Sequence, residues 1–230
     1  MADMRYSRLE MLPGIGAEGV ELIRSGRVLI VGCGALGSLC AMYLAASGVG
    51  SITIADFDTI DISNLQRQLF FTESELGLSK CAILASRMRA LNSDVEVEEL
   101  PVLMNVENAL KHFPQHDFII DGSDNPATKK MTATLCEQLG IPYCIGGVRE
   151  YAGQVMTWIP GHSGYAEIFG DTQTCSGITP CSLGGVLGPA AGMVASVQAA
   201  EAIKYLTRVG KLLTNRLFTF DLSTPSANIF

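Results

Sequence analysis

Short apolar runs alternate with longer mixed segments along the first two thirds of the chain. The apolar runs are rich in Val, Ile and Leu, as in strands that helices cover on both faces, and they occupy 27–31, 51–55, 95–100, 117–121 and 142–147. Segments with helical periodicity precede and separate them, at 14–25, 35–47, 79–91, 106–112 and 125–139. This alternation predicts an α/β fold with a doubly wound, mostly parallel sheet.

The pattern changes after residue 148. GQVMTWIPG at 153–161 and RLFTFDLS at 216–223 predict antiparallel strands at the C-terminal end of the sheet. Residues 161–183 are polar and rich in turn formers, and we interpret them as a mobile crossover loop. The stretch 184–210 starts with small residues and continues as a buried helix. We expect residues 1–230 to form a single domain with the loop at about 161–183 as an insertion.

Composition and charge narrow the class of protein. Hydrophobic residues make up 48% of the chain, and the net charge is −7, so no general basic surface exists for nucleic acid. Pro189 and several glycines interrupt the apolar stretch after residue 184, so we expect no membrane span. The N-terminal MADMRYSRLEML lacks the apolar centre of a signal peptide. We therefore expect a cytoplasmic protein.

The seven cysteines contain no CxxC pair, which argues against a zinc ribbon or a thioredoxin-like site. Five of them lie in strand or helix patterns and are expected to be buried, reduced core residues: Cys33, Cys40, Cys81, Cys136 and Cys144. Cys175 and Cys181 lie in the polar, glycine-rich stretch. The histidines in HFPQH at 112–116 flank a turn, and we expect them at the surface.

A glycine loop follows the first predicted strand, because RVLIVGCGALG at 27–37 contains GxGxxG at 32–37. Glycines allow a phosphate to approach the backbone at a helix N-terminus, as in Rossmann-like folds. Asp56 ends the next strand, about 20 residues later, where a carboxylate can bind ribose hydroxyls. These features fit NAD as well as ATP, and a glycine loop alone can also be a tight turn that binds nothing.

Three further residues bear on the choice between NAD, ATP and a turn that binds nothing: Asn64, Arg67 and Lys80. Arg67 offers a fork of donors and Lys80 a mobile point charge, a pair suited to the β- and γ-phosphates of a triphosphate. Lys80 lies in the first turn of a helix, where the macrodipole disfavours a cation and no structural reason for it is apparent. Taken singly, each of these residues is better explained as a surface residue that binds no ligand. Together they favour ATP.

Asp121 and Asp124, in IIDGSDN, follow the fourth predicted strand. One of these carboxylates could hold Mg²⁺ together with substrate phosphates. Alternatively, Asp124 or Asn125 caps the next helix. Since strand ends of a parallel sheet lie at one edge, the glycine loop, Asp56 and these aspartates are expected to converge.

Several stretches keep the order and spacing of the ThiF/MoeB/HesA family, the bacterial relatives of ubiquitin-activating enzymes, and the chain resembles that family over most of its length. The matching stretches are RYSR at 5–8, VLIVGCGALG at 28–37, ADFDTIDISNLQRQ at 55–68, GLSK at 77–80, DGSDN at 121–125 and LGPAAGMVASVQAAEAIK at 187–204. The resemblance implies ATP- and Mg²⁺-dependent adenylation of the C-terminal glycine of a small ubiquitin-like sulfur carrier that ends in Gly-Gly. It also implies a homodimer and a sulfur donor such as a cysteine desulfurase.

The resemblance also implies roles for individual residues. The nucleotide would be bound by Gly32, Gly34, Ala35, Gly37, Asp56, Asn64, Arg67, Lys80, Asp124, Asn125 and Thr128. Asp124 would hold Mg²⁺, and Arg8 would reach the active site of the neighbouring subunit. Cys181 aligns with the cysteine that links to the carrier in thiamine-pathway members, with Cys175 as a second candidate.

One departure from the family pattern leaves the subfamily open. Many family members carry two CxxC pairs for structural zinc, whereas the first of these regions reads GYAEIFG at 164–170 here, so zinc is not expected. RYSR and Cys181 favour a ThiS-like carrier for thiamine synthesis. The alternatives are a MoaD-like carrier for molybdopterin synthesis, an ATP-dependent tRNA dehydratase, an NAD-dependent oxidoreductase and a non-catalytic binding subunit.

Overall fold

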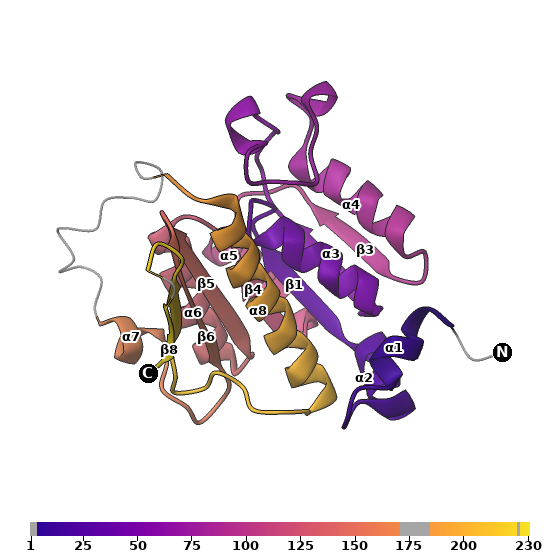
Figure 1. The fold of residues 1–230 in the computed structure, drawn as a ribbon, viewed down its shortest axis with the longest axis vertical. Coiled ribbons are helices and arrows are strands. Elements are labelled where there is room, and N and C mark those ends of the chain that lie inside the picture. Colours follow the sequence, from indigo (N-terminus) through magenta and orange to yellow (C-terminus); the bar gives the residue numbers. More distant parts are fainter. Residues whose placement is uncertain (1–3, 171–184, 225) are drawn as a thin grey trace.

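The computed structural model describes residues 4–170, 185–224 and 226–230 (Figure 1). The helices are η1 (Met4–Tyr6), α1 (Ser7–Glu10), α2 (Gly16–Ser25), α3 (Gly37–Ser47), η2 (Ile62–Asn64), η3 (Glu73–Glu75), α4 (Lys80–Leu91), α5 (Val106–His112), η4 (Phe113–Gln115), α6 (Pro126–Leu139), α7 (Tyr165–Phe169) and α8 (Gly188–Thr207). The strands are β1 (Arg27–Val31), β2 (Ser51–Ala55), β3 (Glu96–Leu100), β4 (Phe118–Asp121), β5 (Tyr143–Arg149), β6 (Ala152–Trp158), β7 (Phe218–Asp221) and β8 (Ser226–Ile229).

The strands form one sheet in the order β3-β2-β1-β4-β5-β6-β7-β8. Strands β1 to β5 pair in parallel, and β6, β7 and β8 extend the sheet in antiparallel fashion. The predicted fold class is therefore confirmed. The chain crosses from β3 over to β4, so the carboxyl ends of β1 and β4 form the switch point at which open α/β sheets bind ligands.

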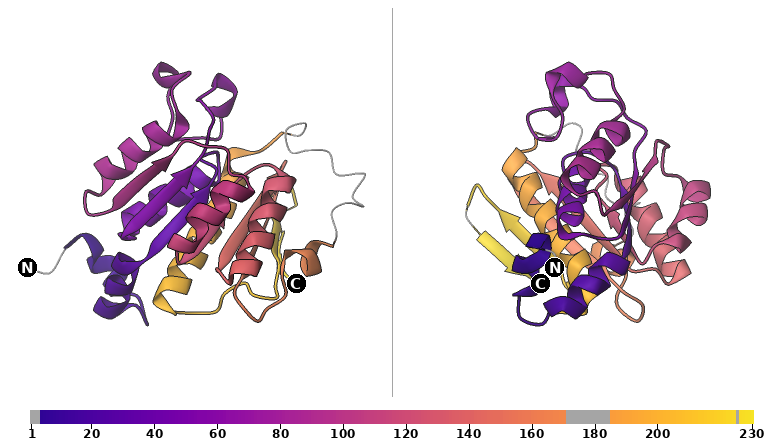
Figure 2. Two further views of the ribbon diagram at one scale, coloured as in Figure 1. Left: turned by 180° about the vertical axis from the view of Figure 1, so that it is seen from behind. Right: turned by 90° about the vertical axis from the view of Figure 1, so that its right-hand side faces the viewer.

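Helices cover both faces of the parallel part of the sheet (Figures 1 and 2). Side chains of α3, α4 and α8 pack with Val28 and Ile30 of β1 in one core, and those of α5 and α6 pack with Leu29 in the other. Successive side chains of a strand point to opposite faces. Both faces of β1 are thus buried, which explains the uninterrupted apolar run in its sequence.

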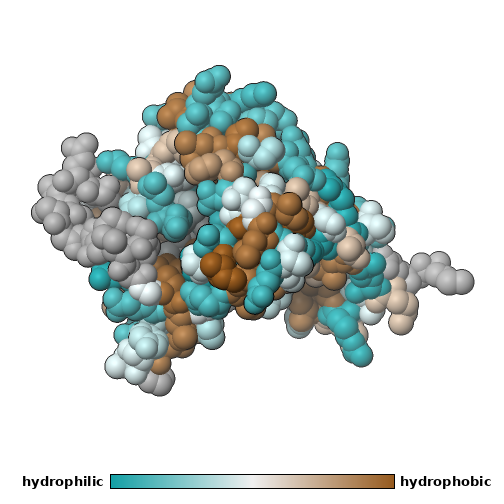
Figure 3. Space-filling model, turned by 90° about the horizontal axis from the view of Figure 1, so that it is seen from above, coloured by the Kyte–Doolittle hydropathy of each residue, from teal (hydrophilic) through white to brown (hydrophobic). Residues whose placement is uncertain are grey.

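Residues 56–79 project beyond the carboxyl end of β2, at the top of Figure 1. Seen from above, this end of the molecule shows hydrophilic and hydrophobic residues intermixed (Figure 3). None of the helices in the described segments is long and apolar enough to cross a bilayer.

The structure differs from the sequence prediction mainly in the C-terminal half. The stretch predicted as a loop at 161–183 contains α7, whose Tyr165 packs into the second core, and its part from 171 onward lies outside the described residues. Five residues are too few to show helical periodicity. Strand β8 was not predicted, because it has only four residues and all of them are exposed, so no buried face marks it. Helix α8 starts at Gly188 because Pro189 suits the first turn of a helix.

Candidate functional site

Three glycines bring two loops into backbone contact at the switch point. A Cβ on Gly37 would lie 1.7 Å from the carbonyl oxygen of Gly32, and one on Gly122 would lie 2.8 Å from the amide nitrogen of Gly37. Gly32 also has a φ of +90°, which side chains rarely adopt. The β1–α3 loop and the β4–α6 turn therefore pack directly on each other. Gly37 serves this packing and does not line the cavity described below.

Asp56 is held by the backbone at the end of β2. Its Oδ2 accepts a hydrogen bond from the amide of Cys33 in the glycine loop (2.7 Å), and its Oδ1 accepts one from the amide of Asp58 (2.8 Å). Each carboxylate oxygen keeps a free lone pair. The carboxylate is half-buried beside the glycine loop and can accept hydrogen bonds from ligand hydroxyls.

Asn64 and Arg67 come from the turn that starts at η2. The side chain of Asn64 closes a capping box, because its Oδ1 accepts from the amide of Asp61 (3.3 Å) and Asp61 accepts from the amide of Ser63 (2.8 Å). Arg67 donates through Nη1 to the carbonyl oxygen of Ser63 (2.9 Å). One of its five N–H groups is thus used to fix the side chain, and the others can donate to an anion.

Lys80 is the first residue of α4, and it is only 5% exposed. Its Nζ lies 2.9 Å from Oδ2 of Asp58, which is half exposed. This ion pair supplies the structural reason for Lys80 that the sequence analysis did not find. Asp58 was not predicted as a site residue. Its role depends on the contact with Lys80, 22 residues later in the chain, which leaves no spacing pattern in the sequence.

Asp124 and Asn125 are neighbours in the β4–α6 turn, but they have different roles. Asn125 caps α6, since its Oδ1 accepts from the amides of Ala127 (2.8 Å) and Thr128 (3.4 Å). Asp124 therefore has no capping role, and its exposed side chain is available to a ligand.

Asp121 does not lie in the cavity lining. Its carboxylate is fully buried, and Oδ1 accepts from Nζ of Lys129 (2.9 Å) and from the hydroxyl of Ser123 (2.7 Å). Of the two aspartates that the sequence offered for Mg²⁺, only Asp124 can face a ligand. Lys129 itself lines the cavity and is a cation that the sequence analysis missed, because its partner lies eight residues earlier in another element.

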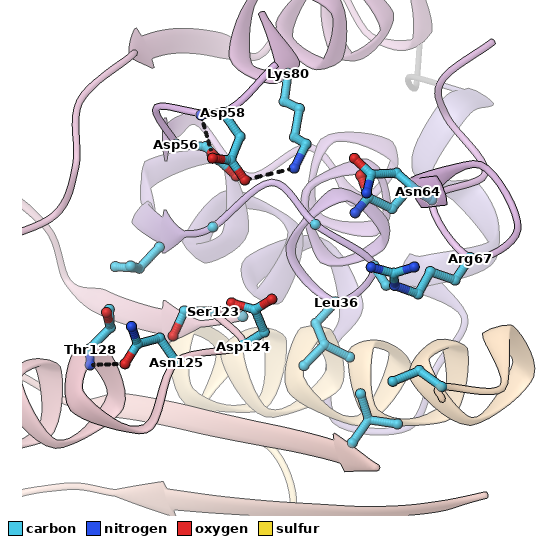
Figure 4. A pocket seen from close by; sticks show the side chains of 18 of the residues that line it. Leu36, Asp56, Asp58, Asn64, Arg67, Lys80, Ser123, Asp124, Asn125 and Thr128 are labelled. Carbon is cyan, nitrogen blue, oxygen red and sulfur yellow. Dashed lines mark hydrogen bonds and ion pairs between the residues drawn. The ribbon is translucent and has the colours of Figure 1, made fainter. Parts of the chain in front are cut away.

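These residues surround one cavity of about 540 Å³ at the carboxyl ends of β1, β2 and β4. Figure 4 shows side chains from several elements pointing into it. The predicted residues that line it are Gly32, Gly34, Ala35, Asp56, Asn64, Arg67, Lys80, Asp124, Asn125 and Thr128. Basic and acidic groups thus lie around one space, as an anionic ligand with a bound cation requires.

Arg8 lies away from this cavity, and the two candidate cysteines are not among the described residues. Arg8 is exposed on α1, where Nη1 lies 3.9 Å from the sulfur of Met11, and it does not line this cavity. Cys181 and Cys175 lie outside the described residues. Within the segments that the structure describes, no group of three or more His, Cys, Asp or Glu side chains could hold a metal ion by itself.

Cys33, in the glycine loop, is not available as a nucleophile. The five described cysteines are buried, as predicted. The Sγ atoms of Cys33 and Cys81 lie 3.7 Å apart, and this hydrogen bond together with burial raises the pKa of Cys33 well above its usual value. The thiol therefore stays protonated at neutral pH.

The prediction that His112 and His116 lie at the surface was wrong. They are 9% and 8% exposed, because Phe113 between them is fully buried and anchors the turn in the second core. The ring of His116 contacts the hydroxyl of Thr53 and the carbonyl oxygen of His112, both at 2.8 Å. Burial lowers the pKa of His116.

Comparison with known proteins gives consistent matches over the whole chain. The family described as "ThiF family" matches residues 6–230. The chain is 36% identical over 222 residues to the probable adenylyltransferase/sulfurtransferase MoeZ of Mycobacterium tuberculosis, covering 94% of this chain and 57% of MoeZ. It is 34% identical over 223 residues to the sulfur carrier protein adenylyltransferase of Thermus thermophilus, covering 94% of this chain and 82% of that protein.

Other matches extend this picture. The adenylyltransferase and sulfurtransferase MOCS3 of Arabidopsis thaliana is 36% identical over 220 residues, with 94% of this chain and 47% of MOCS3 covered. The chain thus spans about half the length of MoeZ and MOCS3. Among solved structures, Escherichia coli MccB with ATP superposes with a TM-score of 0.85 at 24% identity, covering 99% of this chain and 71% of that one. At this identity the likeness shows the fold alone.

Proposed function

The chain belongs to the ThiF family, and on that premise we propose that it adenylates the C-terminal glycine of a small ubiquitin-like sulfur carrier with ATP. The observation that carries this proposal is the gathering of Asn64, Arg67, Lys80 and Asp124 around the cavity beside the glycine loop. An NAD-dependent oxidoreductase has no use for these cations and this carboxylate. We take residues 1–230 as one adenylation domain.

The proposed reaction needs no general base. The terminal carboxylate has a reference pKa of about 3.3–3.7, so it is ionised at neutral pH. One of its oxygens attacks the α-phosphorus of ATP, a new O–P bond forms, and the bond from the α-phosphorus to the bridging oxygen breaks. The products are the acyl-adenylate and pyrophosphate. Catalysis then consists of positioning two anions in line and stabilising charge on the phosphates.

We assign each residue a part of the nucleotide according to its position around the cavity. Asp56 accepts hydrogen bonds from the ribose hydroxyls, since Cys33 and Asp58 hold its carboxylate beside the loop. The backbone of the glycine loop lies under the phosphates at the N-terminus of α3. Arg67 and Lys80 donate to the β- and γ-phosphates. Lys80 leaves Asp58 to do so, exchanging one anionic partner for another.

Asp124 fits a role in holding Mg²⁺. Its carboxylate is exposed at the cavity and caps no helix, and Mg²⁺ is usually bound by one or two carboxylates together with phosphate oxygens. Bound there, the ion would neutralise negative charge on the phosphates. Asn125 and Thr128 line the cavity next to it and contact the nucleotide.

The proposed partners follow from the same family membership. We propose a homodimer in which Arg8 of one subunit completes the site of the other, and a carrier that ends in Gly-Gly. RYSR at 5–8 and Cys181 support a ThiS-like carrier over a MoaD-like one, with Cys181 or Cys175 as the residue that links to it. A sulfur donor such as a cysteine desulfurase would then act on the adenylated carrier.

Carrier-dependent exchange of labelled pyrophosphate into ATP tests this proposal. We expect exchange with a ThiS-like carrier to exceed exchange with a MoaD-like carrier, and ATP with Mg²⁺, but not NAD, to raise the melting temperature. Exchange with the MoaD-like carrier alone would move the chain to molybdopterin synthesis. Absence of exchange with either carrier would overturn the proposed activity.

The metal role of Asp124 has its own test. Asp124→Ala should lower the exchange rate by about 100-fold or more, because charge stabilisation on the phosphates is lost. Its melting temperature should match the wild type, since Asp124 is exposed. Asp94→Ala, a change at an exposed aspartate in the turn before β3, serves as the control and should leave the rate unchanged. Exchange at the wild-type rate in Asp124→Ala would contradict the role.

A further inference from the structure

Gln68 is a buried polar residue at the cavity with an unpaired acceptor. The residue is only 3% exposed, and it lines the cavity. Its Oε1 is buried without a hydrogen-bond partner among the described residues. An unpaired buried amide destabilises a fold, and an apolar side chain of similar size avoids that loss. A hydrogen bond from its NH₂ group, which faces Gly34, to a ligand in the cavity would offset part of that loss and account for its presence.

The backbone places Gln68 on the same face as two residues of the proposed phosphate site. The amides of Arg67 (3.0 Å) and Gln68 (2.9 Å) both donate to the carbonyl oxygen of Asn64, which defines one helical turn. Side chains three and four residues apart in such a turn are neighbours on one face. Asn64, Arg67 and Gln68 therefore approach the cavity together.

Gln68 also lies directly against the glycine loop. Its Nε2 is 3.7 Å from the position that a Cβ on Gly34 would take, and no other group beyond the chain neighbours lies within 4 Å of that position. The preceding residue, Cys33, binds the carboxylate of Asp56, which contacts the ribose in the proposed function. The phosphate attached to the ribose then lies over Gly34, beside Gln68.

We propose that Gln68 binds the α-phosphate of the nucleotide through its side-chain amide and orients the phosphorus that the carrier carboxylate attacks. This inference rests on the proposed function. Phosphate oxygens only accept hydrogen bonds, so the NH₂ group that faces Gly34 donates to the phosphate, and Oε1 takes no part in the contact. Because Gln68 is neutral, its hydrogen bond orients the α-phosphate without neutralising its charge. Arg67 and Lys80 instead stabilise the negative charge of the β- and γ-phosphates.

Binding of AMP isolates this contact, because AMP carries only the α-phosphate. We expect Gln68→Leu to weaken both AMP and ATP by about three- to tenfold in isothermal titration calorimetry, the range for one neutral hydrogen bond. Gln68→Glu should weaken both further, since its charge repels the phosphate. Gln138→Leu, at an exposed position on α6, is the matched control and should bind both nucleotides as the wild type does.

Thermal unfolding without nucleotide separates binding from a structural role. Gln68→Leu should melt at or above the wild-type temperature, because it removes an unpaired buried amide; a lower melting temperature with normal AMP affinity would overturn the inference. Should Gln68→Leu fail to fold, Gln68→Asn, which withdraws the amide by one methylene, should show the same loss for AMP. Weaker binding of ATP together with unchanged binding of AMP would also overturn the inference about Gln68.

The two proposals fail in different ways. If the wild type catalyses carrier-dependent exchange but the Gln68 variants bind AMP normally, only the inference about Gln68 is wrong. If the wild type binds neither ATP nor AMP, the proposed function is wrong and the inference falls with it.

Discussion

At the scale of single residues, missing Cβ atoms decide how closely the two loops of the site approach. Gly37 faces the backbone of Gly32, and Gly122 faces the backbone of Gly37, so no side chain fits between them. Gly34, in the same loop, has only a flexible side chain nearby, at 3.7 Å. The GxGxxG pattern thus contains glycines of two kinds, one required by the fold and one facing the cavity.

This difference predicts opposite effects for two similar substitutions. Gly37→Ala should lower the free energy of unfolding by about 3–5 kcal/mol, because its methyl group would overlap a backbone carbonyl that cannot move freely. Gly34→Ala should change it by no more than about 0.5 kcal/mol, because its methyl meets only ordinary van der Waals contact. Urea unfolding of both variants measures the difference, and equal losses would contradict this account.

At the scale of elements, one ion pair joins the starts of two central strands. Arg27 begins β1, and Asp117 directly precedes β4. Asp117 accepts hydrogen bonds from Nη2 of Arg27 (2.8 Å) and from its backbone amide (2.9 Å). Burial acts to raise the pKa of Asp117, but the hydrogen bonds from Arg27 outweigh it, so the pKa lies below its usual value.

The lowered pKa of Asp117 determines how the free energy of unfolding changes with pH. Because the folded-state pKa is below the unfolded value of about 3.9, Asp117 stabilises the fold above that pH, and the contribution disappears as the pH falls through the folded-state pKa. Asp117→Asn should lower the free energy of unfolding by about 0.5–1 kcal/mol at neutral pH, since the pair is partly exposed. Urea unfolding between pH 7 and pH 3 should show the two proteins converging on acidification. A constant difference would contradict the assignment.

The central elements could be predicted because local pattern and tertiary position agree there. Strand β1 reads as a continuous apolar run since both of its faces are buried, and α6 shows a cap at Asn125 and a glycine at its end. Helix α7 and strand β8 could not be predicted, because one is too short for periodicity and the other has no buried face. Their positions depend on contacts made elsewhere in the fold.

The residues of the candidate site also fall into those that could be predicted from the sequence and those that could not. Residues with a motif, such as Asp56 and Arg67, could be chosen from sequence, since strand ends of a parallel sheet converge. Asp58, Gln68 and Lys129 were missed because their significance depends on an ion pair, an unpaired acceptor and a contact between elements. None of these leaves a spacing pattern in the chain.

At the scale of the whole molecule, the proposed homodimer would complete each site with a residue from the neighbouring subunit. Arg8 is exposed on α1 and does not line the cavity of its own chain. The proposed homodimer places it in the partner's site, as a two-fold interface in which each subunit contributes the same residues permits. This arrangement can be tested without a structure of the dimer.

Mixing two inactive variants should restore activity. Arg8→Ala and Asp124→Ala should each abolish pyrophosphate exchange when assayed alone. After unfolding and refolding together, about one quarter of the wild-type rate should return, because about half of the dimers are mixed and each mixed dimer has one complete site. Activity that does not return on mixing, with dimers present by light scattering, would place Arg8 outside the partner's site.

The contact between Lys80 and Asp58 has a consequence for how the nucleotide competes for its site. The ammonium group already holds a counter-ion, so an incoming phosphate displaces a carboxylate rather than water alone. The lost ion pair offsets part of the electrostatic gain from the phosphate, and rehydration of the released carboxylate recovers only some of that loss. Affinity should therefore depend less steeply on ionic strength than the number of cations around the triphosphate suggests.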